Sequence, residues 1–505
     1  MLLFCIKAKK KKTRTGSWFL KKKRIDKCCV VGGVLNKRVL YNTQNITETN
    51  LMNDTENITH NVTGPMGNDK QMLNDLQRET FDYFLKEVNP ITGLIADKTQ
   101  PGTPSSVAVV GMGLSTYIIG IEKDFLSRED AIKRVLKVLR FFYNSPQGTQ
   151  PDAIGYKGFY YHFLDMATGK RAWQSELSTI DTALFIAGVL AVAAYFKGTD
   201  NNEAEIRRLA DALYTRIDWQ WACNGRNTLT HGWAPETGFI KYRWNRDYNE
   251  GLVMYMLALG SPTCPIKKAG YDEWTATFKV SPAYGIDYLY AGPLFIHQFS
   301  HMWIDFRGIH DDFNRKAGFD YFENSKRATH IHQKYAIDNP KKFEHYGEFG
   351  WGFTASDGPG KKLMKINGKT RSFFDYIARG APYGPDDGTI SPWAVVASLP
   401  FAPEIVIDTI RHAIEKLNLK HHRLYGFDAS YNPTCPDPSG NPNGWVSPWR
   451  FGLNQGPIVI MIENYHTGLL WEVMKQCPYM VKGLQTAGFT DGWLENFKEG
   501  SNTAS

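Results

Sequence analysis

Trp173 to Phe196 reads WQSELSTIDTALFIAGVLAVAAYF, in which a polar start carrying Glu176 leads into a long apolar run. A second stretch has the same form: Glu250 is followed by a mostly apolar segment that ends at Gly260. Proline-free apolar runs of this length predict buried helices, which need other helices around them. A carboxylate at the junction of a polar loop and a buried helix can have a shifted pKa and face a cleft.

Helical spacing of apolar residues recurs along the chain from Met72 onward. The predicted helices cover 72–88, 105–121, 127–143, 176–197, 202–221, 248–259, 284–304, 309–335, 391–399, 403–416 and 456–474. Ser127 is a predicted N-cap, and Pro392 and Pro403 suit first-turn positions. Alternating aromatic and polar residues predict short hairpins at 155–165 and 231–244. The pattern favours an all-α fold in which paired helices close into an α/α toroid, because β-branched runs suited to an α/β sheet are scarce.

The charge of the chain is concentrated at its beginning. Of 505 residues 42% are apolar, which is enough for a large core and excludes a wholly disordered protein. The net charge is +8, but residues 1–40 hold thirteen Lys or Arg and a single acid, Asp26. The rest of the chain therefore has a net charge of about −4, so the folded part gives no reason to expect a nucleic-acid partner.

Residues 1–65 are predicted to be a disordered leader, basic at first and then rich in Asn and Thr. An anionic-membrane or nucleic-acid patch is the alternative for the basic part, and glycosylation acceptors are the alternative for the Asn-Thr part. No clear signal peptide is visible, and no apolar stretch approaches the ~20 residues of a membrane span. Residues 66–500 are predicted to form a single catalytic domain.

Metal and cofactor signatures are absent from the sequence. His297 and His301 have i, i+4 spacing, but Gln298 stands where a zinc protease has Glu, so a structural or substrate-contacting pair is favoured. The acidic turns at 356–358 and 386–388 are explained as turns more simply than as calcium sites. The seven cysteines have no CxxC spacing. We therefore expect neither a metal nor a cofactor.

A group of acids remains, and it has the composition needed to cleave a glycosidic bond. That reaction uses one carboxylic acid to protonate the departing oxygen and one carboxylate as base or nucleophile. Helix caps, and ion pairs with Arg243, Arg246 or Arg450, are the structural alternatives. Tryptophans beside Gly or Pro could form a sugar-binding groove, with ordinary packing as their alternative. The candidate acids are Glu176, Asp181, Asp247, Glu250, Asp387, Asp428 and Glu463.

Several motifs in fixed order resemble those of the bacterial glucoamylase-like family, which includes endo-β-1,2-glucanases of glycoside hydrolase family 144. They are Ser175-Glu-Leu-Ser-Thr-Ile-Asp-Thr-Ala183, Tyr248-Asn-Glu-Gly251, Leu257-Ala-Leu-Gly-Ser-Pro262, His297-Gln-Phe-Ser-His-Met-Trp-Ile-Asp-Phe-Arg-Gly308, Gly350-Trp-Gly-Phe-Thr-Ala-Ser-Asp-Gly358, Asp387-Gly-Thr-Ile-Ser-Pro392 and Ile462-Glu-Asn-Tyr465. The resemblance covers about residues 72–496. It implies an (α/α)6 barrel with long loops and short hairpins on the active-site face, and a metal-independent hydrolase acting on β-1,2-glucan.

The resemblance also implies roles for individual residues. Glu250 and Glu176 match expected catalytic positions, with Asp181 assisting, and the apolar flank of Glu250 favours it as the general acid. Expected substrate contacts are Trp173, Trp233, Arg243, Asp387, Trp393, Asp428, Trp449 and Glu463. The expected partner is a glucan, and the protein is expected to be a periplasmic or secreted monomer with no transmembrane segment. A transglycosylase, a glucosidase of other linkage, a lyase and a non-catalytic glycan-binding protein are the alternatives.

Overall fold

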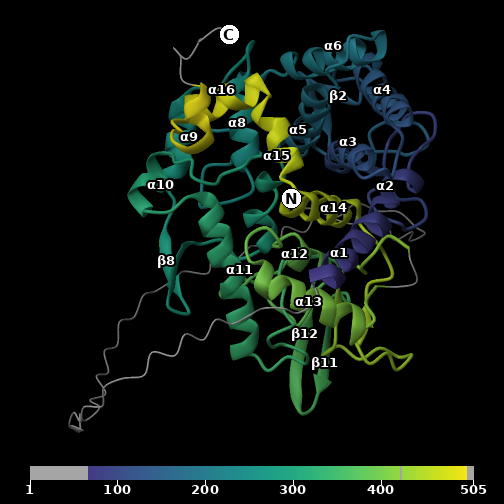
Figure 1. The fold of residues 1–505 in the computed structure, drawn as a ribbon, viewed down its shortest axis with the longest axis vertical. Coiled ribbons are helices and arrows are strands. Elements are labelled where there is room, and N and C mark those ends of the chain that lie inside the picture. Colours follow the sequence, from purple (N-terminus) through teal and green to yellow (C-terminus); the bar gives the residue numbers. More distant parts are fainter. Residues whose placement is uncertain (1–65, 421–423, 498–505) are drawn as a thin grey trace, which may run out of the picture. The chain divides into compact units, whose positions relative to one another are not determined.

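The helices that carry the long apolar runs are buried on nearly every side. In the computed structural model, which describes residues 66–420 and 424–497, they contact one another in the order α12, α14, α3, α5, α8 (Figure 1). Burial on all faces explains why these segments lack the polar stripe of a surface helix. Their bounds are α3 (Val107–Glu122), α5 (Thr179–Tyr195), α8 (Leu252–Gly260), α12 (Pro392–Val396) and α14 (Gly452–His466).

A segment with two short 3-10 helices, η1 (Leu294–His297) and η2 (Ser300–Met302), forms hydrogen bonds with both α8 and α12. The Ser300 hydroxyl accepts the N–H of Val253 at 3.1 Å, and the Gln298 amide donates to the carbonyl of Ala394 at 2.7 Å. The predicted helix over 284–304 is therefore wrong. Gly285, Gly292 and Pro293 interrupt the helical pattern, and tertiary hydrogen bonds replace the helical ones.

An outer layer of helices packs on the buried ones. α4 (Arg128–Asn144) contacts α3 and α6 (Asn201–Thr215), α6 also contacts α5, α13 (Pro403–Glu415) packs on α12, and α16 (Pro478–Ala487) packs on α8. The predicted starts are confirmed: Ser127 accepts the N–H of Asp130, and Pro392 and Pro403 lie in first turns. The remaining helices are α1 (Met66–Phe81), α2 (Tyr83–Lys86), α7 (Trp219–Ala222), α9 (Lys268–Thr275), α10 (Asp312–Ala317), α11 (Tyr321–Asp338), α15 (Leu469–Lys475) and η3 (Gly492–Phe497).

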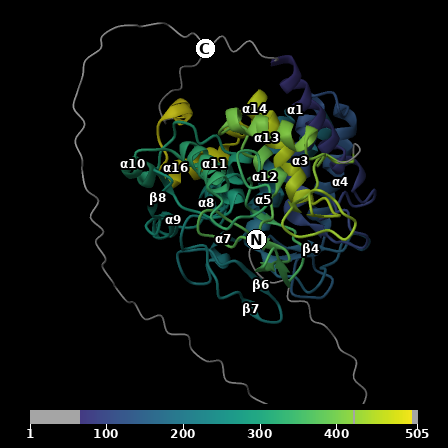
Figure 2. The ribbon, with the colours of Figure 1, turned by 90° about the horizontal axis from the view of Figure 1, so that it is seen from below.

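A five-stranded antiparallel sheet has the strand order β2-β3-β5-β6-β7. Strands β2, β3 and β5 precede α5 in the chain, and β6 and β7 follow it. Figure 2 shows β6 and β7 at one side of the helices. Its strands are β2 (Gly155–Tyr156), β3 (Phe159–Tyr161), β5 (Leu177–Ser178), β6 (Gly232–Ala234) and β7 (Gly238–Phe239). Both predicted hairpins are thereby confirmed. Two-stranded pairs complete the strands: β1 (Ser105–Ser106) with β4 (Phe163–Leu164), β8 (Val280–Ala283) with β9 (Ile286–Leu289), β10 (Ala355–Ser356) with β13 (Ile377–Ala378), β11 (Lys362–Ile366) with β12 (Lys369–Phe373), and β14 (Tyr431–Asn432) with β15 (Trp445–Val446).

The described residues thus have a predominantly helical fold with small hairpins, as predicted for the fold class. Within that part of the chain, no helix is long and apolar enough to cross a membrane. Cys223, Cys264, Cys435 and Cys477 are free thiols. The predicted leader at 1–65 lies outside the described residues, so the division of the chain into domains stays a prediction.

Candidate active site

Glu176 lies directly before β5, the central strand of the five-stranded sheet. Its side chain is 33% exposed, and one carboxylate oxygen lies 3.0 Å from Nδ1 of His162. Its backbone carbonyl accepts the N–H of His162 at 2.9 Å. The helix predicted from residue 176 begins only at Thr179, with Ser178 as its N-cap, so Glu176 is not a helix cap. One side-chain contact and one backbone hydrogen bond with the same histidine therefore hold Glu176 beside the sheet.

Asp181 belongs to the first turn of α5 and is buried behind Glu176. The Ser178 hydroxyl donates to its Oδ2 at 2.5 Å, while its Oδ1 lies 3.6 Å from Nε2 of His162. The His162 imidazole therefore stands between two carboxylates, one on each ring nitrogen. A carboxylate can only accept hydrogen bonds when ionised, so this arrangement favours a histidine that donates.

The electrostatics of this group keep Glu176 ionised. Burial opposes a charge on His162, but Asp181 and Glu176 outweigh it and raise the pKa of the imidazole. Burial of Glu176 acts to raise its pKa, but the hydrogen bond and positive charge of His162 lower it overall. A carboxylate with a lowered pKa is suited to accept a proton or orient water rather than to donate a proton at neutral pH.

Asp97 is a member of the same cluster that the sequence analysis missed. It is 8% exposed, and burial raises its pKa to about 6, with Asp181 acting in the same direction and Lys98 and His162 acting against it. Asp97 stands in a short loop far from Glu176 in sequence, with only the short apolar run at 94–96 before it and no long helical pattern. Only the folded chain brings it to His162.

Glu250 lies two residues before α8 and is 5% exposed. Its backbone carbonyl accepts the Ser300 hydroxyl at 3.3 Å, which ties it to the segment between α8 and α12. His231 stacks on Trp244 with ring centroids 4.0 Å apart, and burial lowers its pKa to about 4 against the opposing charges of Glu250 and Glu176. Because both carboxylates act on one imidazole, they border the same region of the structure.

Trp173 is the predicted stacking residue with the clearest place beside this group. It is 64% exposed, its ring lies 5.1 Å from that of Phe163, and Phe163 stacks on His162 at 3.9 Å. Trp173 and Gln174 both have positive φ, near 54° and 53°. Strained backbone of this kind costs about 1–3 kcal/mol and is concentrated at functional sites. The exposed Trp173 ring therefore lies beside Phe163, which stacks on the histidine that contacts Glu176.

The other predicted tryptophans are more enclosed. Trp233 packs against Tyr156 and Trp221, with ring centroids 5.1 and 5.8 Å away, although it belongs to the same sheet as Glu176. Trp393 is 2% exposed in the first turn of α12, and Trp449 is partly buried. Their predicted contacts with sugar stay predictions.

The predicted polar contacts each have partners within the protein. Asp387 forms a fully buried bidentate pair with Arg379 at 2.7 and 2.9 Å, which lowers its pKa against the effect of burial. Asp428 pairs with Arg450 at 2.5 Å. Further internal contacts are those of Glu463 with Gln77 at 3.0 Å and Thr467 at 2.9 Å, and of Arg243 with the carbonyls of Cys223 at 3.0 Å and Thr228 at 2.5 Å. These contacts stabilise loops and helices, and the predicted contacts of these residues with substrate stay predictions.

The histidine pair at 297 and 301 belongs to the core. His297 contacts Asn324 and the carbonyl of Ala291, and His301 contacts Ser325. Burial lowers their pKa values to about 4 and about 3, so both are neutral. Among the described residues, no group of three or more His, Cys, Asp or Glu is placed to hold a metal ion.

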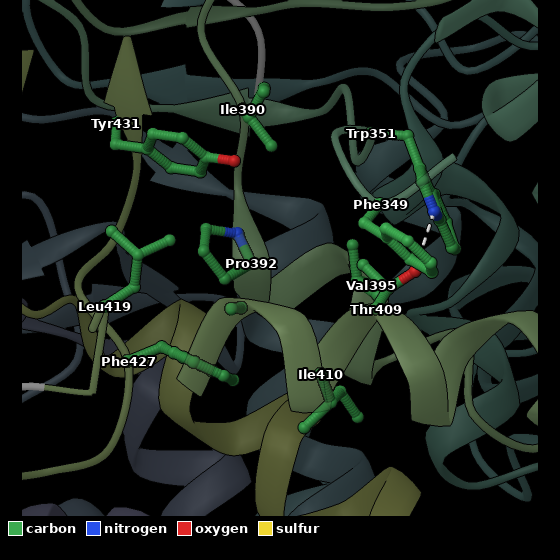
Figure 3. A pocket seen from close by; sticks show the side chains of 11 residues that line it. Phe349, Trp351, Ile390, Pro392, Val395, Thr409, Ile410, Leu419, Phe427 and Tyr431 are labelled. Atoms are coloured by element: carbon green, nitrogen blue, oxygen red, sulfur yellow. Dashed lines mark hydrogen bonds between the residues drawn. The ribbon is translucent and has the colours of Figure 1, made fainter. Parts of the chain in front are cut away.

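A small apolar pocket lies between α12 and α13, away from these carboxylates. Figure 3 shows its lining of aromatic and aliphatic side chains, with the Trp351 indole donating to the Thr409 hydroxyl at 3.0 Å. It has no charged lining residue and so offers no acid–base chemistry. The candidate active site is instead the group of Glu176, His162, Asp181, Asp97 and Glu250.

Comparisons with known proteins relate the chain to glucoamylase-like proteins. Residues 241–478 match the family model Glycoamylase, described as "Putative glucoamylase". A solved structure from Bacteroides uniformis, also described as a "putative glucoamylase", is 31% identical, covers 84% of this chain and 98% of its own, and has a TM-score of 0.74. The endo-β-1,2-glucanase from Chitinophaga pinensis, solved with sophorotriose and glucose, is 27% identical over 84% of this chain and 99% of its own, with a TM-score of 0.73.

A curated relative extends the comparison to a larger protein. The exo-β-1,2-glucooligosaccharide sophorohydrolase (non-reducing end) of Parabacteroides distasonis is 27% identical in an alignment of 470 positions that covers 86% of this chain. The chain spans only 60% of the length of that relative.

Proposed function

Because the chain belongs to the glucoamylase-like family, we propose that it is a glycoside hydrolase that cleaves β-1,2-glucan. The endo-acting form is favoured, because the endo-β-1,2-glucanase of Chitinophaga pinensis matches over 99% of its length, whereas the exo-acting relative matches over 60%. The products would be short β-1,2-linked gluco-oligosaccharides.

The architecture we propose is an (α/α)6 barrel. The contacts α12–α14–α3–α5–α8, together with the hydrogen bonds of η1 and η2 to α8 and α12, support a closed inner ring, and the amphipathic outer helices support a second layer. Glu250 lies two residues before α8, and Asp181 is in the first turn of α5. Both therefore stand at N-terminal ends of inner helices, where loops and hairpins can build a substrate cleft.

Glu250 is proposed as the general acid and Glu176 as the carboxylate that accepts a proton from water. The observation that carries this assignment is the Glu176–His162 contact of 3.0 Å, which favours an ionised Glu176. Glu250 is the more deeply buried of the two glutamates, 5% exposed before the apolar helix α8, and takes the role of acid because the ionised Glu176 is assigned the other role. Asp181 acts through His162, and the exposed face of Trp173 is proposed to stack on a glucose ring.

The experiment is incubation of the protein with separate linear glucans of β-1,2, β-1,3, β-1,4 and α-1,4 linkage, followed by product sizing and anomer detection. Cleavage of β-1,2-glucan into a range of short oligosaccharides supports the proposal. Release of sophorose alone would instead support the exo-acting form. Cleavage of a different glucan, with β-1,2-glucan left intact, would overturn the substrate assignment.

The proposal also covers the cellular location and the oligomeric state of the protein. We propose a periplasmic or secreted monomer, because the family resemblance implies a polysaccharide substrate and one chain supplies every residue of the candidate site. Cell fractionation tests the location, and size-exclusion chromatography with light scattering tests the assembly.

A further inference from the structure

We propose that His162 is a positioning residue that holds the Glu176 carboxylate through Nδ1 while Asp181 holds His162 through Nε2. This inference rests on the proposed function of Glu176, but it concerns a residue to which the family resemblance assigned no role. It makes the chemistry of the partly exposed Glu176 depend on the two more deeply buried side chains of His162 and Asp181.

The geometry of the chain supports the order of these contacts. Glu176 Oε1 lies 3.0 Å from His162 Nδ1, and Asp181 Oδ1 lies 3.6 Å from His162 Nε2. Within the described part of the protein, His162 Nε2 and Asp181 Oδ1 are buried and neither has another hydrogen-bond partner. Two such atoms facing each other are natural partners, because an unpaired buried polar group is costly.

Each member is fixed by an independent structural contact. The His162 N–H donates to the carbonyl of Glu176, and its ring stacks on Phe163 with planes 13° apart. The Ser178 hydroxyl donates to Asp181 and accepts its backbone N–H, which locks Asp181 at the start of α5. The imidazole thus has a defined orientation, and its contact with Glu176 fixes the position of that carboxylate.

The charges around His162 come from three elements. Glu176 stands before β5, Asp181 opens α5, and Asp97 belongs to the loop before β1, where Lys98 partly offsets its charge. The negative charges of these carboxylates stabilise a protonated His162, whereas Lys98 favours the ionised form of Asp97. Removal of the imidazole therefore takes away a positive charge and a donor from Glu176, and its pKa should rise.

The test compares His162→Asn with His162→Gln. Asn places an amide donor near the position of Nδ1, so it can keep the bond to Glu176, whereas Gln reaches the position of Nε2 and loses that bond. We expect His162→Gln to lower kcat on the order of 100-fold with little change in KM, and His162→Asn to stay within about tenfold of wild type. His412→Asn on α13 is the matched control, because that histidine stacks on Phe349 outside the site.

The pH profile separates positioning from general support of the fold. In wild type the acidic limb of kcat/KM lies low because Glu176 has a lowered pKa, and in His162→Gln it should move to higher pH. Unchanged limbs and unchanged kcat in both His162 variants would overturn the inference. If His162→Gln fails to fold, as judged by circular dichroism, a His162→Asn profile identical to wild type down to acidic pH would also overturn it, because Asn cannot supply the charge.

A readout without substrate distinguishes this inference from the proposed function. Protein with ¹⁵N-labelled imidazoles is titrated by NMR, and the His162 signal is assigned by its loss in His162→Asn. Asp181→Asn should lower the pKa of His162, because it removes the charge beside Nε2. That result without any glucan hydrolysis by wild type would defeat the proposed function alone, whereas hydrolysis without that shift would defeat the role of His162 alone.

Discussion

At the scale of single residues, the two glutamates of the opening pattern have different surroundings. Both stand before long apolar helices in the sequence, but Glu176 is a third exposed and paired with His162, whereas Glu250 is 5% exposed before α8. Sequence could identify both positions. It could not assign their surroundings, because only the folded sheet brings His162 to Glu176, and only the loop before β1 brings Asp97 to His162.

Glu176→Gln is expected to lower kcat by roughly 10²–10⁴-fold, because an amide cannot accept a proton from water. Steady-state hydrolysis of β-1,2-glucan measures this effect. Glu129→Gln on the exposed face of α4 is the control and should leave kcat unchanged. A Glu176→Gln enzyme within tenfold of wild type would exclude Glu176 as the base.

Trp173→Ala is expected to raise KM about fivefold, because loss of an exposed stacking face costs on the order of 1 kcal/mol. Trp173→Phe keeps an aromatic face and should recover most of the affinity. Isothermal titration of a β-1,2-gluco-oligosaccharide against an inactive variant gives the same comparison without turnover. Equal affinities for the Ala and Phe variants would remove Trp173 from the proposed cleft.

At the scale of elements, the apolar runs located the inner helices well, with α3, α5 and α8 close to their predicted bounds. The failure at 284–304 has a physical cause: its apolar side chains are buried as strands and 3-10 turns, and side chains such as Gln298 supply hydrogen bonds that a helix would otherwise make. Local spacing alone cannot reveal such tertiary bonds. The short helix α9 was missed for lack of a long pattern, and α6 and α7 were predicted as the single helix over 202–221.

The close contact of α3 with α5 positions Asp181, and glycine makes it possible. A Cβ on Gly188 would lie 1.9 Å from the carbonyl oxygen of Gly111, so the two helix backbones would have to move apart. Gly188→Ala should therefore lower the free energy of unfolding by roughly 1–3 kcal/mol and reduce activity with it.

Thermal unfolding of Gly188→Ala measures this destabilisation. Gly347→Ala is the matched control, since no atom lies within 4 Å of its added Cβ and its φ is ordinary. Equal unfolding temperatures for the two variants would contradict the proposed helix contact.

At the scale of the whole molecule, neutral buried histidines make stability depend on pH. Burial lowers the pKa of His297 to about 4, and those of His301 and His332 to about 3. When the pH falls below about 6.5, the ordinary pKa of histidine, these histidines take up protons in the unfolded chain but stay neutral in the folded chain. Their stabilising contribution is therefore full above pH 6.5 and falls as pH drops toward 4, by roughly 1.4 kcal/mol per pH unit for each histidine.

Asp97 acts in the opposite direction, because its pKa is raised to about 6 in the folded protein and the folded state binds its proton first. The raised pKa of His162 adds to the effect of Asp97, whereas His231, with a pKa lowered to about 4, adds to that of the three histidines. The histidines with lowered pKa values are the larger group, so the urea midpoint should be lower at pH 5 than at pH 7. An equal or higher midpoint at pH 5 would show that the buried histidines do not control acid stability.

The central claim is that two carboxylates, with Glu250 as the acid, hydrolyse β-1,2-glucan. The most direct measurement is the rate of reducing-end formation from linear β-1,2-glucan by wild type and by Glu250→Gln, with binding of the same glucan measured in parallel. We predict clear turnover by wild type, a loss of roughly 10²–10⁴-fold in Glu250→Gln, and retained glucan binding in the variant. Equal turnover by the two proteins, or binding without turnover by wild type, would contradict the account.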